Sequence, residues 1–85
     1  MNIENNLDLI LQFTKERDEA VLTLDKDTII SFCQKYQVPI PKKELSFWAG
    51  IHKTICQIPS ASPEQKKMSE AWLIEHGFNI DIKNV

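Results

Sequence analysis

Residues 44–58, ELSFWAGIHKTICQI, form the densest apolar segment of this 85-residue chain. At about 100° per residue on a helix, the apolar side chains of this segment form two neighbouring stripes. The first stripe contains Phe47, Ile51, Ile55 and Ile58, and the second contains Trp48, His52 and Cys56, with Leu45 at its edge. Together they are wider than the apolar face of an ordinary surface helix. We therefore expect a central helix over about residues 43–58 that other parts of the chain contact on two sides.

Two further helices are expected before the central one. The first covers about residues 3–17, and its apolar face contains Ile3, Leu7, Ile10, Leu11 and Thr14, with Leu9 and Phe13 widening it at one edge. The second covers about residues 26–36, because Asp25 is a good N-cap and the prolines within residues 38–41 cannot continue a helix. Val38 and Ile40 are apolar, so we expect this loop to pack down.

The clearest local signal lies at the start of the last helix. Ser62 is a good N-cap, Pro63 suits the first helical position, and Gln65 completes a capping box with Ser62. This helix is expected over about residues 63–76, where Gly77 ends it and Phe78 supplies the hydrophobic contact typical of such caps. Four short helices with short loops predict an all-α fold, a compact bundle that forms a single domain over residues 1–85.

Residues 20–24 are open to two interpretations. Their β-branched and aliphatic side chains favour extended structure, but the segment is short and lies between helices. It is either a linker whose Leu22 or Leu24 fills the core, or a short strand that pairs with residues 78–82. In the latter segment the apolar residues alternate: Phe78, Ile80 and Ile82. From about residue 79 onward we expect a mobile tail.

Composition restricts the classes of function. The net charge of −2 gives no general attraction to nucleic acid or to an anionic membrane. No apolar run has the length of a membrane helix, and Glu4 and Asp8 stand where a secretory signal carries basic residues. Cys33 and Cys56 both lie in apolar helical patterns, which favours two reduced thiols and a cytoplasmic location over a disulfide. A core this small also favours pairing with a second copy or with a partner.

The residue types that carry catalysis do not form a recognised site. His52 and Cys56 lie one turn apart, but a metal site needs three or four ligands and a catalytic thiol needs a base and an orienting group. No phosphate-binding or nucleophile motif is present in the sequence. We therefore expect no enzyme and no cofactor, with His52 at the core margin and its polar edge in water.

Small and off-face apolar residues suggest a surface for a partner. Glycine within a helix costs about 1 kcal/mol relative to alanine, so the Ala49-Gly50 step indicates either close approach of a neighbouring backbone or contact with a partner. Ile30 and Ile74 lie off the apolar faces of their helices. These four residues are the candidate contacts for a protein partner, or for a second copy of the chain.

The alternative is an accessory protein that associates with nucleic acid. The doublets Lys42-Lys43 and Lys66-Lys67 both fall near helix starts and would form one patch if the last two helices brought them together. Four lysines without arginine give weak, salt-sensitive phosphate binding. A solvated lysine face is the simpler explanation of the same residues.

Three segments carry a resemblance to a known group of proteins. They are ISFCQKYQVPIP, FWAGIHKTICQIP and SPEQKKMSEAWLIEHGF, within about residues 18–78. This arrangement resembles small uncharacterised proteins of prophages and related mobile elements of Gram-positive bacteria. The resemblance implies an accessory protein of the bacterial cytoplasm and carries no activity with it. The sequence thus favours a non-enzymatic accessory protein that acts by protein–protein interaction.

Overall fold

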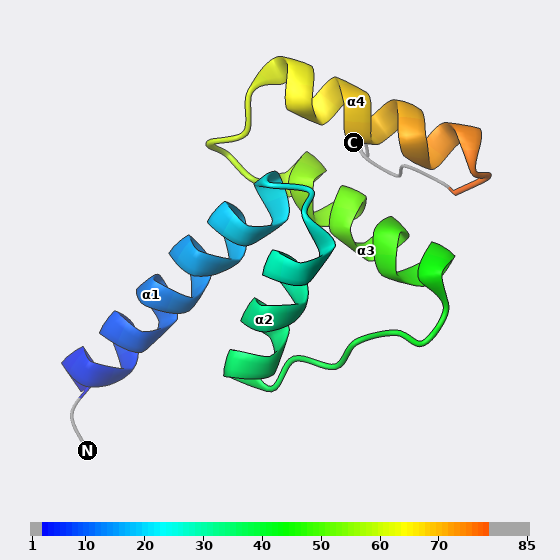
Figure 1. Cartoon of the computed structure of the whole chain (residues 1–85). Helices are drawn as coiled ribbons and strands as arrows, with labels where there is room; N and C mark the ends of the chain where they lie inside the picture. Colours follow the sequence, from blue (N-terminus) through cyan, green and yellow to red (C-terminus); the bar gives the residue numbers. More distant parts are fainter. Residues whose placement is uncertain (1–2, 79–85) are drawn as a thin grey trace. The chain divides into compact units, whose positions relative to one another are not determined.

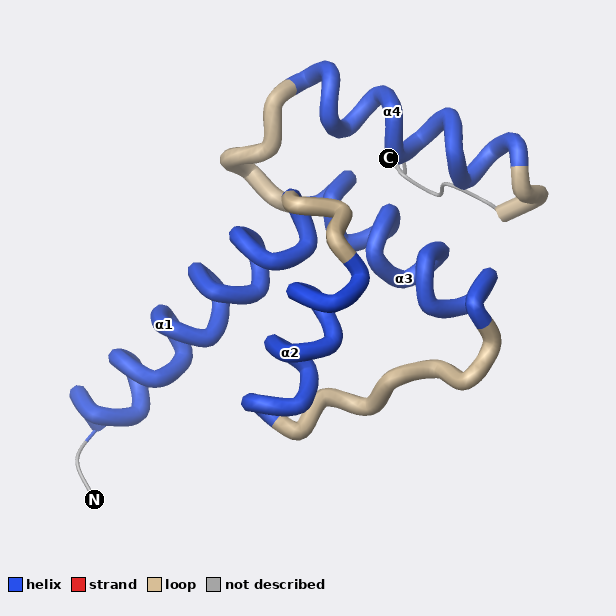
Figure 2. The backbone as a smooth tube through the Cα atoms, in the orientation of Figure 1, coloured by secondary structure: helices blue, strands red, loops and turns tan. Residues whose placement is uncertain are grey.

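The computed structural model describes residues 3–78 of the chain. Within them the chain forms four helices and no strand: α1 (Ile3–Leu22), α2 (Lys26–Tyr36), α3 (Glu44–Gln57) and α4 (Pro63–Glu75) (Figures 1 and 2). The prediction of an all-α fold with four helices is confirmed. Contacts divide the chain into two units, Met1–Ile40 and Pro41–Val85. The expected single domain stays a prediction, and the expected mobile tail from residue 79 lies outside the described residues.

The first unit is an antiparallel pair of α1 and α2, held by an aromatic cluster (Figure 1). The Phe13 ring of α1 lies 5.3 Å from the ring of Phe32 and 5.1 Å from that of Tyr36, both on α2. Ile29, Phe32 and Cys33 of α2 are buried, and their i, i+3, i+4 spacing places them on one face of the helix. Tilted and edge-on aromatic pairs at these distances are favourable beyond the area they bury. Aromatic packing therefore fixes where the end of α2 meets α1.

A carboxylate beside this cluster accepts hydrogen bonds from both helices. Glu16 of α1 accepts from Lys35 Nζ at 3.0 Å and from the Tyr36 hydroxyl at 2.9 Å, both on α2. Gln12 Nε2, one turn earlier on α1, donates a third bond at 3.0 Å. The hydrogen bonds from Gln12, Lys35 and Tyr36 lower the pKa of Glu16 to about 2. The charged form of Glu16 thus supports the pairing of the two helices.

The first helix is longer than its sequence pattern indicates. We predicted an end within residues 15–19 and a linker or strand over residues 20–24, but α1 continues to Leu22. The predicted linker is therefore wrong for residues 20–22 and the predicted strand for residues 20–24, and most of the proposed partner segment lies outside the described residues. Leu24, one of two residues expected to fill the core, is 45% exposed. Ala20 and Val21 are buried, and this burial outweighs the β propensity of the segment. Thr23 then caps the helix, because its hydroxyl donates to Ala20 O at 2.6 Å.

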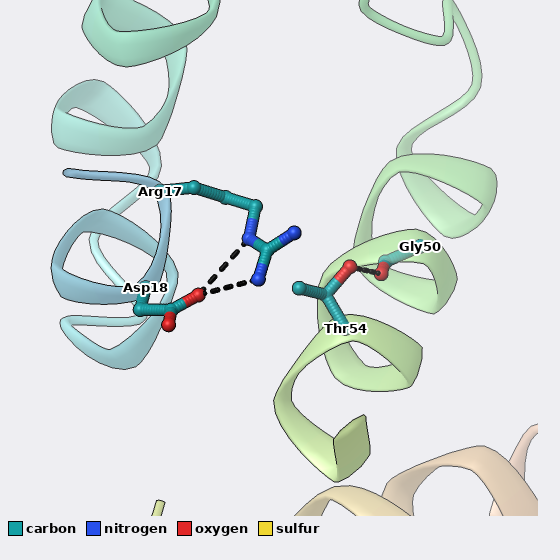
Figure 3. Close-up of polar contacts among 4 residues, drawn as sticks. All are labelled: Arg17, Asp18, Gly50 and Thr54. Carbon is teal, nitrogen blue, oxygen red and sulfur yellow. Dashed lines mark hydrogen bonds and ion pairs between the residues drawn. The ribbon is translucent and has the colours of Figure 1, made fainter. Parts of the chain in front are cut away.

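The charged run that was expected to end the first helix lies inside it instead. Within this run Arg17 Nη2 lies 2.7 Å from the carboxylate of its neighbour Asp18 (Figure 3). Both side chains are partly shielded from solvent, at 36% and 18% exposure. An ion pair between adjacent residues neutralises the run locally without ending the helix, so charge alone was a poor indicator of the helix end.

The boundaries of α2 follow the sequence signals closely. The Asp25 carboxylate accepts from Thr28 N at 3.0 Å, which confirms the N-cap. At the other end Gln37 takes a left-handed conformation, with φ of 58°, before the prolines. The loop behind it packs down only in part, since Val38 is half-buried and Ile40 is exposed.

The second unit is an antiparallel hairpin of α3 and α4 (Figure 2). The predicted capping box at Ser62 and Gln65 is present in both directions. Gly77 has φ of 82°, and Phe78 N donates to Leu73 O at 2.8 Å, which confirms the predicted glycine cap. Between the helices Ile58 and Ala61 are buried, so the short loop contributes to the core. Packing against α4 accounts for one of the two sides on which α3 was expected to be contacted, and the second side stays a prediction.

The glycine of α3 does not mark close approach of another backbone. A Cβ atom built on Gly50 meets nothing within 4 Å, so the first explanation drawn from the sequence, close approach of a neighbouring backbone, is wrong. The carbonyl of Gly50 accepts a hydrogen bond from Thr54 Oγ1 at 2.9 Å (Figure 3). This local bond does not need a glycine, because position 50 contributes only its backbone carbonyl.

We expect that replacing Glu16 with glutamine weakens the first unit at neutral pH. The folded pKa of Glu16 is about 2 and its ordinary value is 4.5, so its contribution is present above about pH 4.5 and is lost as the pH falls toward 2. Urea unfolding followed by circular dichroism should show lower stability for E16Q at neutral pH and a smaller difference in acid. The exposed Glu19→Gln is the matched control. Equal stabilities of E16Q and E19Q at neutral pH would contradict the role of Glu16.

We expect that Gly50→Ala stabilises the protein by about 0.5–1 kcal/mol. Alanine removes backbone freedom from the unfolded chain, and open space around position 50 accommodates its methyl group. Denaturant unfolding measures the change. A loss of stability would show that a neighbour approaches this position after all.

Candidate functional site

The first half of α1 carries the most prominent apolar surface among the described residues. Four large aliphatic side chains there are exposed by 54–62%: Leu7, Leu9, Ile10 and Leu11. We call Leu7, Ile10, Leu11 and Thr14 the α1 stripe, because these residues share one side of the helix. The sequence predicted this side as the core face of the helix, and that prediction is wrong. Single exposed aliphatics are normal, but several adjacent ones are typical of an interaction surface.

The exposure follows from the side of α1 that α2 occupies. Phe13 and Glu16, which contact α2, lie at the edge that we expected merely to widen the apolar face. Tyr36 is the last residue of α2, and its ring already contacts Phe13. The part of α1 before this contact therefore extends past the end of α2. Leu9 lies one turn before Phe13 on the same side, whereas the α1 stripe lies on another side.

The four predicted partner contacts have different surroundings. Ala49 is buried, because it shares with His52 and Cys56 the side of α3 that faces α4, so it is not a surface contact. Gly50 is exposed and has open space around it. Ile74 of α4 is 64% exposed, and Ile30 of α2 is half-buried. A partner-binding role stays a prediction for Gly50, Ile30 and Ile74.

The two lysine doublets do not form one patch in the second unit. Cys56 near the end of α3 contacts Lys66 near the start of α4, as an antiparallel hairpin requires. Lys42 and Lys43 precede the opposite end of α3. The doublets are therefore separated by the length of a 14-residue helix, about 20 Å at 1.5 Å per residue. A phosphate-binding role for either doublet stays a prediction, but the shared patch does not form.

A buried histidine links α3 to α4. His52 is 8% exposed, and its Nδ1 lies 2.9 Å from the hydroxyl of Ser69, which is 2% exposed. The sequence led us to expect His52 at a wet margin, and this expectation is wrong. Ser69 shares a helix face with Leu73, so it is carried into the core beside His52. The hydrogen bond satisfies two polar groups that would be costly to bury alone.

Aromatic rings continue from His52 along one side of α4. The ring of Trp72 stacks on His52, with centroids 4.6 Å apart, and on His76, with centroids 4.0 Å apart. Phe78 lies nearly parallel to Trp72 at 6.0 Å between ring centroids, so it makes the hydrophobic contact that was expected beside the glycine cap. Burial of the His52 ring, and to a smaller extent the charge of His76, lower the pKa of His52. The neutral ring is thus the form that the core stabilises.

Neither cysteine has the surroundings of an activated nucleophile. Both are free thiols, Cys33 buried and Cys56 half-buried. Burial raises the pKa of each thiol, which disfavours the reactive thiolate. Cys56 Sγ lies 3.9 Å from Lys66 O, while His52 is directed to Ser69. Over the described part of the chain, no group of three or more His, Cys, Asp or Glu side chains is arranged to hold a metal ion.

Ser69 is the residue of this core that the sequence analysis missed. A serine within a helix usually points to solvent or to its own backbone. A faint signal was available, because Ser69 lies four residues before Leu73 and seven before His76, on one face of α4. Met68, the apolar residue directly before Ser69, is 67% exposed.

Comparison with known proteins gives no relative for the chain. None of the family models, curated proteins and solved structures that were compared matches it. Within residues 3–78, no helix combines the length and the hydropathy that crossing a membrane requires. The surfaces of the two helix pairs are therefore the remaining indication of function.

We expect the stability of the second unit to fall in mild acid because of His52. Its folded pKa lies below the ordinary value of 6.5, so the unfolded chain binds more protons and stability decreases as the pH falls through about 6.5. Urea unfolding at pH 8 and pH 5 should show this slope in the wild type and a flatter one in His52→Asn. His76→Asn should keep most of the slope, because burial is the main cause of the shift. A wild-type protein whose stability does not change between these pH values would contradict burial of the neutral His52 ring.

Proposed function

We propose that the protein is a non-enzymatic accessory protein that acts by binding protein through the α1 stripe. The observation that carries this proposal is the exposure of Leu7, Ile10 and Leu11, at 54%, 60% and 59%, on a helix whose other side packs against α2. Full burial of each such side chain contributes about 1.5–3 kcal/mol. A partner that covers the stripe therefore gains substantial free energy from a few residues.

The shape of the surface supports a helical or flat partner. Leu7, Ile10, Leu11 and Thr14 follow the i, i+3, i+4, i+7 spacing of helices that dock by one apolar face. The exposed residues lie on a regular helix, so little backbone order is lost when a partner binds. These features support binding of protein as the role of the α1 stripe.

The cellular setting is a separate part of the proposal. The resemblance of residues 18–78 to small proteins of Gram-positive prophages and mobile elements supports an origin in such an element. Two free thiols are typical of a reducing compartment, which supports a cytoplasmic location. Binding to a protein of the host cell or of the element itself fits both features.

Affinity capture with matched variants tests the binding role. Wild-type protein is immobilised, exposed to an extract of its native host, and the retained proteins are quantified by mass spectrometry. We expect the double variant Leu7→Ser, Ile10→Ser to reduce recovery of a specific protein by about tenfold or more, because two apolar contacts are lost. Leu9→Ser is the control, since Leu9 is 62% exposed on another side of α1. Recovery that is equal for the double variant and the control would overturn the proposal.

A further inference from the structure

We propose that the partner of the α1 stripe is a second copy of this chain, paired antiparallel along α1. The inference deepens the proposed function and rests on it, because it requires the stripe to be a protein-binding surface. Its support comes from the charges beside the stripe. When two copies of α1 run in opposite directions, the acidic and basic groups of one copy face the basic and acidic groups of the other.

Asp8 and Lys15 form one charged edge of the stripe. Both side chains are exposed, and they lie seven residues apart, which places them within about 20° of each other around the helix. Leu11 lies between them along the chain and borders the same edge. Neither Asp8 nor Lys15 forms an ion pair with a described residue of its own chain, whereas the neighbouring Glu16 and Arg17 are paired with Lys35 and Asp18. The charges of this edge are therefore available to a partner.

The direction of pairing decides which charges meet. In an antiparallel pair of identical helices, an edge faces the same edge of the second copy, so Asp8 meets Lys15 of the other chain twice by symmetry. In a parallel pair this edge would face the opposite one, which carries Phe13 and Arg17, and Arg17 is already paired within its own chain. The self-complementary arrangement is thus specific to the antiparallel pair.

The apolar residues fit the same register. With the two-fold axis between positions 10 and 11, Ile10 of each chain lies opposite Leu11 of the other, and Leu7 lies opposite Thr14. Asp8 and Lys15 of opposite chains are then offset by two residues, about 3 Å along the axis, which a lysine side chain spans. A net charge of −2 per chain adds little repulsion. So short an interface predicts weak, concentration-dependent dimers.

Sedimentation velocity of the purified full chain over a range of concentrations tests the pairing. We expect the wild type to shift from monomer to dimer as its concentration rises. Asp8→Lys and Lys15→Asp each place like charges together twice, and each should raise the dissociation constant by about tenfold at low salt. Glu75→Lys, a charge reversal at an exposed site on α4, should leave the dissociation constant unchanged. Circular dichroism checks that each variant keeps its helices.

Mixing the two charge variants gives the decisive outcome. An Asp8→Lys chain and a Lys15→Asp chain restore opposite charges across an antiparallel pair, so the mixture should associate at least as tightly as the wild type. A mixture that is no tighter than either variant alone overturns the antiparallel pairing. So does a wild type that stays monomeric up to about 1 mM. If the monomer still captures another protein through the stripe, the proposed function stands and the self-pairing fails; if capture is also lost, both fail.

Discussion

The second helix is 11 residues long and the first is 20, and this difference in length limits how much of α1 can be buried against α2. Aromatic contacts and the hydrogen bonds to Glu16 fix the end of α2 against Phe13 and its following turn. The earlier turns of α1 remain helical but have no opposite helix in their own unit. The mismatch leaves Leu9 exposed on the side of α1 that packs against α2 further along, whereas the α1 stripe is exposed because it lies on another side of the helix. The stripe is therefore the most informative feature for function.

In the α3–α4 hairpin the important requirement is that polar groups buried in the core form hydrogen bonds. His52 and Ser69 satisfy each other inside the core, and Trp72 covers the imidazole from the α4 side. A histidine and a cysteine one turn apart on a helix have the appearance of a site in a sequence. In the folded unit His52 contacts Ser69 and Cys56 contacts the carbonyl of Lys66, both on α4. The one-turn spacing of the histidine and the cysteine therefore reflects packing of one face of α3 against α4.

Capping residues in the sequence predicted well where the helices begin and end. The sequence pattern predicted much less well which side chains are buried. Asp25, Ser62 and Gly77 act on backbone groups within four residues, so their neighbours in the sequence determine the outcome. The side of α1 that packs, which carries Phe13 and not Ile10, depends on where α2 lies. The periodicity of the α1 sequence carries no information about the position of α2. Ser69 was buried and Met68 exposed for the same reason. The candidate surface thus became visible only once each helix had its partner.

The cluster around Glu16 also divides α1 into two parts with different opening behaviour. Amide hydrogens in the turns that pack on α2 exchange with solvent only when the helix pair separates, whereas those of residues 7–11 exchange by local unwinding of the part of α1 that extends past α2. Hydrogen exchange would therefore report a step in protection near Phe13. A molecule that covers the α1 stripe would slow amide exchange in residues 7–11 and so remove this step, without changing the helix itself. Hydrogen exchange would then identify, residue by residue, the part of α1 that the molecule covers.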